Sequence, residues 1–214
     1  LAADFGPRMI LFYNGPRCGA SAPDHLHFQA APAGLLPVEA EVLEPRNRVG
    51  VRRRKGVSLW RTGGLGRGIL VIEGRNRASV SSAFGEAIAA LCRLTGSASR
   101  KPRPESGAEG RIEKRNTSLP GSPGPWAGSF NPSDDEPMLN LLCTHTGSAW
   151  RLILFPRRTL RPAAYYREGE GRLLVSPGAA DMGGMGIAPM EQDFLALDQE
   201  LIEGIFWEVA LDES

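Results

Sequence analysis

Two of the three histidines in the 214-residue chain lie within a short stretch of alternating character. From residue 24 to residue 30, polar and apolar residues alternate, which is the two-residue period of a β-strand. In a strand, His25, His27 and Gln29 lie on one face about 6.6 Å apart, and Leu26 and Phe28 lie on the other. The pattern predicts a strand that buries Leu26 and Phe28 and presents a row of three polar side chains.

A row of this kind can do chemistry at phosphorus. A neutral imidazole attacks an activated phosphorus atom and can leave again, because the phosphoramidate it forms is itself reactive. We assign this role to His27, and we expect His25 and Gln29 to donate hydrogen bonds to the non-bridging oxygens of the transition state. The residues alone leave two other interpretations open. His-x-His can supply two ligands of a metal site, or both histidines can be ordinary surface residues.

The segment that precedes this strand has the composition of an anion-binding turn. Gly15 and Gly19 allow backbone N–H groups to approach a phosphate closely, and Ser21 adds a hydroxyl group. Asn14 begins the segment. We therefore predict that Asn14, Gly15, Gly19 and Ser21 contact phosphate.

Two arginines in the second half of the chain are further candidates for phosphate binding. Arg157 and Arg161 follow the apolar run 150–155, and prolines stand beside both of them. An arginine just beyond a strand end can make bidentate contacts with a phosphate or with sugar hydroxyls. The alternative is that both are ordinary surface arginines.

The elements that must position these residues are short, and most of them are strands. Apolar runs or two-residue alternation predict strands at 9–13, 24–30, 56–61, 69–73, 138–144, 150–155 and 172–176. Helical spacing of apolar residues predicts one helix at 79–95, capped by the preceding serines and ended by Gly96, and another within 189–211. Antiparallel pairing is the economical arrangement, so we expect an α+β fold.

A change of composition divides the chain into three parts. Residues 96–137 include 6 Gly, 7 Pro and 7 Ser, and few large apolar residues. Burial of so few apolar side chains cannot offset the conformational entropy lost on ordering, so we predict a flexible linker or insertion there. We expect residues 1–95 to form the first part of one domain, with the active-site strand, and residues 138–214 to form the second part, with a C-terminal helix. Because the sequence starts at Leu1, in what looks like the end of a helix, we also expect that a natural N-terminal segment precedes it.

Charge and composition limit the partners. The net charge is +1, three cysteines show no CxxC spacing, and no apolar run approaches the ~20 residues of a membrane span. These features predict a cytoplasmic protein with no membrane partner. A basic stretch lies between residues 44 and 55; it has no interleaved aromatic residue, so we interpret it as a solvated basic loop and expect no nucleic-acid partner.

The run His25-Leu26-His27-Phe28-Gln29, behind a small-residue turn that ends in Ser21, resembles the active-site strand of the histidine triad superfamily. It is most similar to the branch with Gln in place of the third His: galactose-1-phosphate uridylyltransferases, diadenosine tetraphosphate phosphorylases and GDP-L-galactose phosphorylases. The stretches 136–142, 150–158 and 176–179 resemble a bacterial group of the same branch.

The resemblance implies an antiparallel half-barrel sheet with packed helices and a covalent nucleotidyl-histidine mechanism. His27 would be the nucleophile, His25 its phosphate-contacting neighbour and Gln29 the residue that stabilises the intermediate. The substrates would be a nucleotide or nucleotide sugar and a phosphate acceptor, so the expected activity is that of a nucleotidyltransferase or phosphorylase. A nucleotide hydrolase and a non-catalytic nucleotide-binding protein are the alternatives. No cofactor is evident, and zinc would need ligands from outside this sequence.

Overall fold

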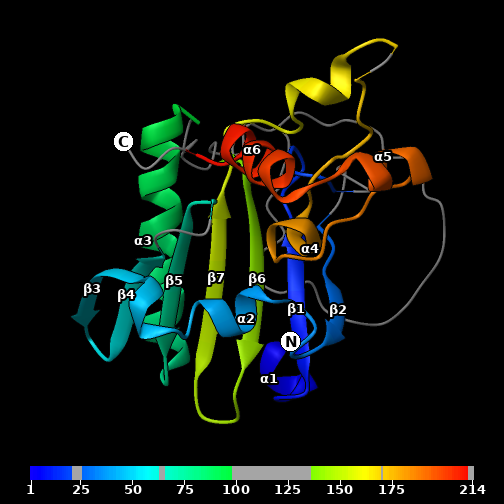
Figure 1. Cartoon of the computed structure of the whole chain (residues 1–214). Coiled ribbons are helices and arrows are strands. Elements are labelled where there is room, and N and C mark those ends of the chain that lie inside the picture. Colours follow the sequence, from blue (N-terminus) through cyan, green and yellow to red (C-terminus); the bar gives the residue numbers. More distant parts are fainter. Residues whose placement is uncertain (21–25, 63–65, 98–135, 170, 212–214) are drawn as a thin grey trace, which may run out of the picture.

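The computed structural model describes residues 1–20, 26–62, 66–97, 136–169 and 171–211, and it shows an α+β fold built on one seven-stranded antiparallel sheet (Figure 1). The strand order is β2-β1-β6-β7-β5-β4-β3, and every neighbouring pair is antiparallel. The predicted fold class is therefore confirmed. The strands are Met9–Asn14 (β1), Gln29–Pro32 (β2), Arg48–Arg54 (β3), Val57–Thr62 (β4), Ile69–Gly74 (β5), Leu139–His145 (β6) and Trp150–Pro156 (β7).

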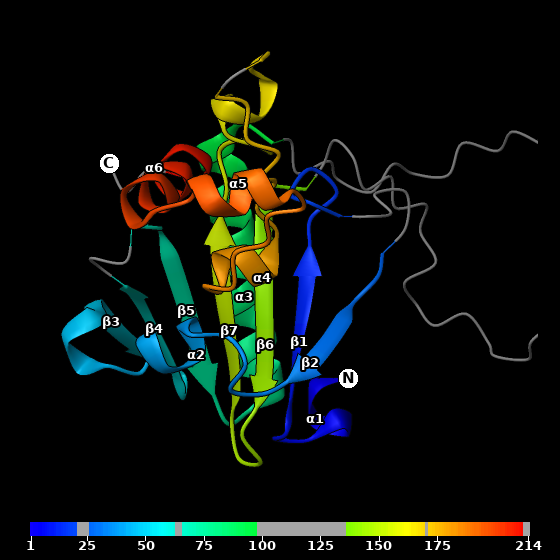
Figure 2. The ribbon, with the colours of Figure 1, turned by 45° about the vertical axis from the view of Figure 1, so that its right-hand side comes forward.

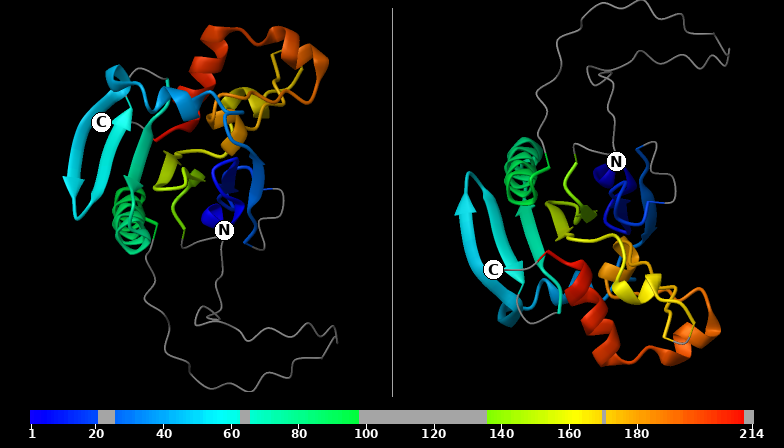
Figure 3. Two further views of the ribbon diagram at one scale, coloured as in Figure 1. Left: turned by 90° about the horizontal axis from the view of Figure 1, so that it is seen from below. Right: turned by 90° about the horizontal axis from the view of Figure 1, so that it is seen from above.

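Helices cover both faces of this sheet. The longest helix, α3, lies on one face, and α2, α4 and α6 lie on the opposite face, as the rotated views show (Figures 2 and 3). The α-helices are Ala2–Phe5 (α1), Val38–Glu41 (α2), Arg77–Thr95 (α3), Ala179–Met182 (α4), Glu191–Ala196 (α5) and Gln199–Val209 (α6), and two 3-10 helices span Pro45–Asn47 (η1) and Ala163–Tyr166 (η2).

Coverage on both faces explains why the central strands read as continuous apolar runs. In β7, Ile153 and Phe155 face the cluster under α2, α4 and α6, whereas Leu154 faces the cluster under α3. In β5, Val71 and Ile72 divide in the same way. A strand that is buried on both sides has no polar face and therefore shows no alternation.

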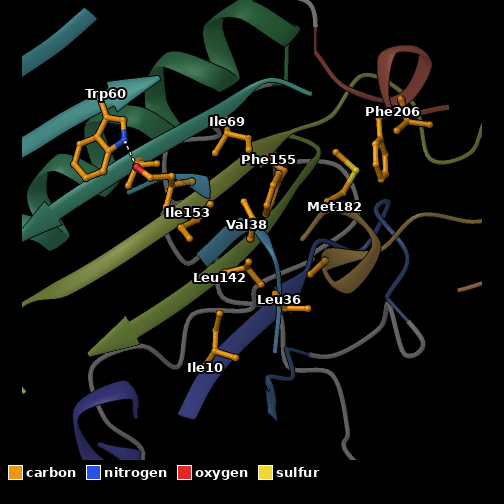
Figure 4. Packing of buried hydrophobic residues seen from close by; sticks show 14 residues of the cluster. Ile10, Leu36, Val38, Trp60, Ile69, Leu142, Ile153, Phe155, Met182 and Phe206 are labelled. Carbon is orange, nitrogen blue, oxygen red and sulfur yellow. Dashed lines mark hydrogen bonds between the residues drawn. The ribbon is translucent and has the colours of Figure 1, made fainter. Parts of the chain in front are cut away.

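The larger cluster joins the sheet to the helices that surround the candidate site. Phe155 of β7 packs with Val38 of α2, Met182 of α4 and Phe206 of α6 (Figure 4). Trp60 belongs to the same cluster and donates its indole N–H to the Val42 carbonyl at 3.2 Å, which satisfies its polar atom inside the core. This cluster holds α4 and the C-terminal helix against the sheet.

The strong local patterns correctly predict several elements. The runs 9–13, 56–61, 69–73, 138–144 and 150–155 form β1, β4, β5, β6 and β7, and the pairs β4–β5 and β6–β7 are antiparallel as expected. The predicted helix 79–95 is α3, which ends at Gly96 with φ of 68°. Its N-terminal cap is Asn76, whose side chain accepts from the Ser79 N–H, and not one of the serines.

The basic stretch is a strand and not a loop. Arg48–Arg54 forms β3 at one edge of the sheet, paired with β4 on one side only. A register shift between Val49 and Arg52 interrupts the pairing, and Gly50 there has φ of 62°. Arginine side chains and a bulge protect a sheet edge from pairing with another chain, so charge and edge position agree here.

The helix predicted within 189–211 is present as α6, which Asp198 caps by accepting from the Leu201 N–H at 2.8 Å, and a second helix, α5, precedes it. Two other expectations are wrong. Residues 172–176 form no strand, although Leu173 and Val175 are buried against Ile205 of α6. The strand predicted at 24–30 begins only at Gln29.

Some predictions fall outside the described residues: those for His25, Ser21 and the segment 98–135. Residues from both the first and the last part of the chain contribute to the same sheet, since β1 pairs with β6. Among the described residues, no helix is long and apolar enough to cross a membrane.

Candidate functional site

The turn that follows β1, residues 15–20 (the β1 turn), packs tightly against two other segments. The Gly15 N–H donates to the Leu139 carbonyl at 3.0 Å, and a Cβ at Gly15 would lie 2.8 Å from that oxygen. Gly19 has φ of 86°, and a Cβ there would lie 3.2 Å from Cα of Gly178. Both glycines therefore permit close backbone contacts within the protein, and the Gly15 N–H is bonded to protein.

A buried network of hydrogen-bonded polar side chains lies under the β1 turn. Asn140 of β6 is fully buried, and its Nδ2 donates to Oδ1 of Asn14 and to the Cys18 carbonyl, both at 2.7 Å. Oδ1 of Asn14 also accepts from the Ala179 N–H at 2.7 Å. Asn14 thus joins the end of β1 both to β6 and to the start of α4.

Arg157, which follows β7, completes this hydrogen-bonded network. Its Nη1 donates to Oδ1 of Asn140 at 2.6 Å and to the Pro177 carbonyl at 2.8 Å. Its remaining N–H groups donate to backbone carbonyls, those of Val209, Thr159 and Leu160. We call Asn14, Asn140 and Arg157 the polar brace.

The geometry places Arg157 in a structural position and not in the phosphate-binding one expected from the sequence. It is 1% exposed, and the five N–H donors of its guanidinium all point at protein oxygens. Burial lowers the pKa of Arg157. No donor is left for a ligand in this conformation.

Arg161 is only partly buried and stays a candidate for phosphate binding. Its Nε donates to the Ser176 hydroxyl at 3.0 Å, and its guanidinium carbon lies 4.1 Å from the centre of the Tyr165 ring. These contacts hold the side chain between η2 and the segment before α4.

A buried carboxylate shapes the start of α4. Asp181 accepts from the Gly178 N–H at 2.9 Å and from the Ile187 N–H at 2.7 Å. Burial raises the pKa of Asp181, and the two backbone N–H groups oppose that shift. The carboxylate fixes the loops on both sides of α4, next to the β1 turn.

A second carboxylate lies on the other side of β1. The Tyr13 hydroxyl donates to Oε2 of Glu136 at 2.8 Å, and Nη2 of Arg17 donates to the Glu136 backbone carbonyl at 2.9 Å. Burial raises the pKa of Glu136, against the opposing effects of the Tyr13 hydrogen bond and the Arg17 charge. Burial also raises the pKa of Tyr13, and Glu136 adds to that rise.

His27 and Gln29 lie beside the end of β1. Gln29 pairs with Phe12, and the Tyr13 and Phe28 rings lie 5.7 Å apart, so the two segments stay adjacent to at least Phe28. Directly opposite residues share a face, so the register puts Gln29 on the face of Phe12, where α4 lies. His27 precedes β2 by two residues and adjoins Phe28 in the sequence.

The burial predicted for the neighbours of His27 is wrong. Leu26 is 60% exposed and Phe28 is 47% exposed, while His27 is half-buried. The reason is position: Leu26 and Phe28 precede β2, which is an edge strand paired with β1 alone among the described strands. Phosphate contact by Asn14, Gly19 and Gln29 stays a prediction, whereas the Gly15 N–H that was expected to approach phosphate is bonded to the Leu139 carbonyl.

Sequence reasoning missed Asn140, Asp181 and Glu136. Asn140 carried a usable signal, because an amide inside the apolar run 138–142 must find partners when the strand is buried. Asp181 and Glu136 stand in segments without a regular pattern. In the described part of the chain, no group of three or more His, Cys, Asp or Glu residues is arranged to hold a metal ion.

Comparisons with known proteins give two findings. The family model described as "Domain of unknown function (DUF4922)" matches residues 1–32, which comprise α1, β1, the β1 turn, the segment with both candidate histidines, and β2. The crystal structure of a DUF4931 family protein (BCE0241) from Bacillus cereus ATCC 10987 is similar at 16% sequence identity and a TM-score of 0.36, over 82% of this chain and 65% of that chain. The chain thus spans about two thirds of that protein's length. No curated protein matches the chain. The match to the family model, over residues 1–32, includes the segment that carries the candidate nucleophile His27.

Proposed function

We propose that the chain catalyses nucleotidyl transfer through a covalent nucleotidyl-histidine intermediate on His27. The substrate would be a nucleoside diphosphate sugar or a dinucleotide, cleaved at the α-phosphate, and the acceptor would be inorganic phosphate or a sugar phosphate. The observation that supports the proposal is the pairing of Gln29 with Phe12, together with the contact between the Phe28 and Tyr13 rings, because both keep the neighbours of His27 beside the braced end of β1. The resemblance of residues 25–29 to the histidine triad strand supplies the chemistry.

The reaction would have two displacements at one phosphorus atom. An unprotonated ring nitrogen of His27 forms a bond to the α-phosphorus, the bond from that phosphorus to the bridging oxygen breaks, and the sugar phosphate leaves with the electron pair. A phosphate oxygen then attacks the same phosphorus, the P–N bond breaks, and its electron pair returns to the imidazole. The products are a nucleoside diphosphate and free enzyme.

The other residues would act on charge and position. Gln29 begins β2 two residues after His27, and its amide would donate to a non-bridging oxygen as the phosphorus becomes five-coordinate. Arg161 would meet the phosphate of the leaving group or of the acceptor. The β1 turn would fix the approach of the nucleotide because the polar brace holds it from below.

The test is labelling of the protein by nucleotides that carry label in the α-phosphate. A panel of nucleotide sugars is incubated with the chain, and we expect acid-labile label on histidine that inorganic phosphate discharges. His27→Asn should abolish labelling and keep most ground-state binding, since the carboxamide is polar but forms no intermediate. Gln29→Ala should slow both steps by about 10²-fold to 10³-fold, the value of one lost transition-state hydrogen bond.

His145→Asn is the matched control. His145 ends β6 beside Trp150, at the end of that strand remote from Asn140, so its replacement should leave labelling unchanged. Label discharged by water alone would indicate a hydrolase, and tight nucleotide binding without label would indicate a binding protein. Undiminished turnover in His27→Asn would refute the proposed mechanism.

A further inference from the structure

We propose that Asn140 is a positioning residue for this reaction: it holds the β1 turn closed against β6 and α4, and thereby sets where a bound phosphate meets His27. The catalytic part rests on the proposed function of His27. The mechanical part, closure of the β1 turn, can be measured without any substrate.

The bonding around Asn140 admits one orientation of its amide. The Cys18 carbonyl can only accept and the Arg157 guanidinium can only donate, so Nδ2 must face Cys18 and Oδ1 must face Arg157. The remaining Nδ2 hydrogen goes to Asn14, whose own orientation the Ala179 N–H fixes in the same way. Each polar atom of the fully buried Asn140 side chain therefore has a defined hydrogen-bond partner.

These bonds join segments that are far apart in the sequence. Through Asn140 the end of β1, the middle of the β1 turn and the residue after β7 are held together, and through Asn14 the start of α4 is added. The ribbon views show α4 lying against the sheet beside β1 and β6 (Figures 1 and 2). Asn14 lies two residues after Phe12, which pairs with Gln29. Displacement of the braced end of β1 would therefore shift the start of β2, two residues after His27.

Asn140→Asp is the most selective perturbation. The carboxylate keeps an acceptor for Arg157, but it replaces both Nδ2 hydrogens with an oxygen that faces Oδ1 of Asn14 and the Cys18 carbonyl. Oxygen atoms without a hydrogen between them repel at the distance of about 2.7 Å that separates these groups. The variant should open the β1 turn and leave the rest of the core in place.

Cys18 reports this opening directly. It is fully buried within the β1 turn, and burial raises the pKa of its thiol to about 12, so in the closed turn it should react slowly with an alkylating reagent. In Asn140→Asp we expect its alkylation rate, followed by mass spectrometry, to rise at least about tenfold, because local opening exposes the thiol. Cys92 and Cys143 are internal controls and should react at their wild-type rates.

Leu142→Ala is the control for general loss of stability. Leu142 lies two residues further along β6, is fully buried in the apolar cluster, and has no polar side-chain atom with which to bond the polar brace. Its removal should leave the ratio of Cys18 reactivity to that of the other two thiols unchanged. A parallel rise at all three cysteines in Asn140→Asp would indicate global unfolding and would overturn the selective role.

The positioning role is tested by the split between binding and chemistry. In Asn140→Asp we expect the rate of His27 labelling to fall by about 10²-fold, the effect of a displacement near 1 Å, with nucleotide affinity within about threefold of wild type. Equal labelling rates in Asn140→Asp and wild type would overturn the role. If the wild-type protein is never labelled, the proposed function fails and the positioning role fails with it, whatever the thiol result. If labelling occurs but Cys18 stays protected, only the present inference fails.

Discussion

Replacement of Arg157 by Met should destabilise the protein strongly, although no carboxylate is bonded to this arginine among the described residues. Methionine keeps much of the length and apolar volume of the side chain and removes its five N–H donors. The carbonyl groups that accept from Arg157 differ in whether they keep another hydrogen-bond donor in the variant. The Val209 carbonyl still accepts from the Arg158 N–H at 2.9 Å, and the carbonyls of Thr159 and Leu160 make only part-buried hydrogen bonds.

Two buried acceptors lose a donor outright, Oδ1 of Asn140 and the Pro177 carbonyl. An unsatisfied buried acceptor costs about 1–3 kcal/mol, which gives about 2–6 kcal/mol for the pair. Removal of a buried positive charge offsets part of this cost, because burial already disfavours the charged form of Arg157. We expect a net loss of about 3 kcal/mol in the free energy of unfolding, or roughly 6–12 °C in Tm.

The adjacent arginine is the matched control. Arg158 is exposed and donates to the carbonyls of Trp207 and Glu208, so Arg158→Met should change stability by less than about 0.5 kcal/mol. Both variants are compared by urea unfolding at pH 7, with the midpoint and the slope recorded. Similar stabilities for the two variants would refute the reasoning. Loss of nucleotide affinity without loss of stability in Arg157→Met would restore the phosphate-binding role expected from the sequence.

Two further predictions concern the surroundings of the β1 turn. Gly19→Ala should lower the free energy of unfolding by about 2–3 kcal/mol, because the new Cβ meets Gly178 and φ is strained at 86°. Gly147→Ala is the control: its φ is 84° but the space around it is open, so the loss should be only about 1–2 kcal/mol. Equal losses of stability in urea unfolding would argue against the close contact at Gly19. Burial raises the pKa of Glu136 above its ordinary value of 4.5, so the folded state holds this proton more tightly than the unfolded state and loses stability as the pH rises above about 4.5. Glu136→Gln should therefore gain stability relative to wild type between about pH 4 and pH 7, and a constant difference across unfolding curves in that range would contradict the shift.

Much of the framework follows from local sequence patterns. The apolar runs that form β1, β5, β6 and β7, and the helical spacing in α3, correctly predict these elements because a buried segment must be apolar wherever it packs. The antiparallel arrangement also follows, since short strands joined by short turns pair as hairpins. The candidate nucleophile, His27, was found from residue type and spacing alone.

Position in the sheet is what local patterns could not supply. The alternation around His27 resembles a half-buried strand, yet Leu26 and Phe28 precede the edge strand β2 and are exposed. The charged run that forms β3 resembles a loop, yet an edge strand tolerates charge because one side of it faces solvent. Burial depends on what lies across from a strand, and that is a property of the whole sheet.

The polar brace depends on tertiary structure in the same way. Asn14 and Asn140 are 126 positions apart and Arg157 lies another 17 positions on, so no local period relates them. The amino-acid sequence by itself determined which segments are apolar enough to form the core, and it supplied His27 as a candidate for phosphorus chemistry. Only the packed sheet decided that Arg157 lies beneath the β1 turn instead of at a ligand, because a buried guanidinium must direct its donors to whatever oxygens the neighbouring segments bring within reach.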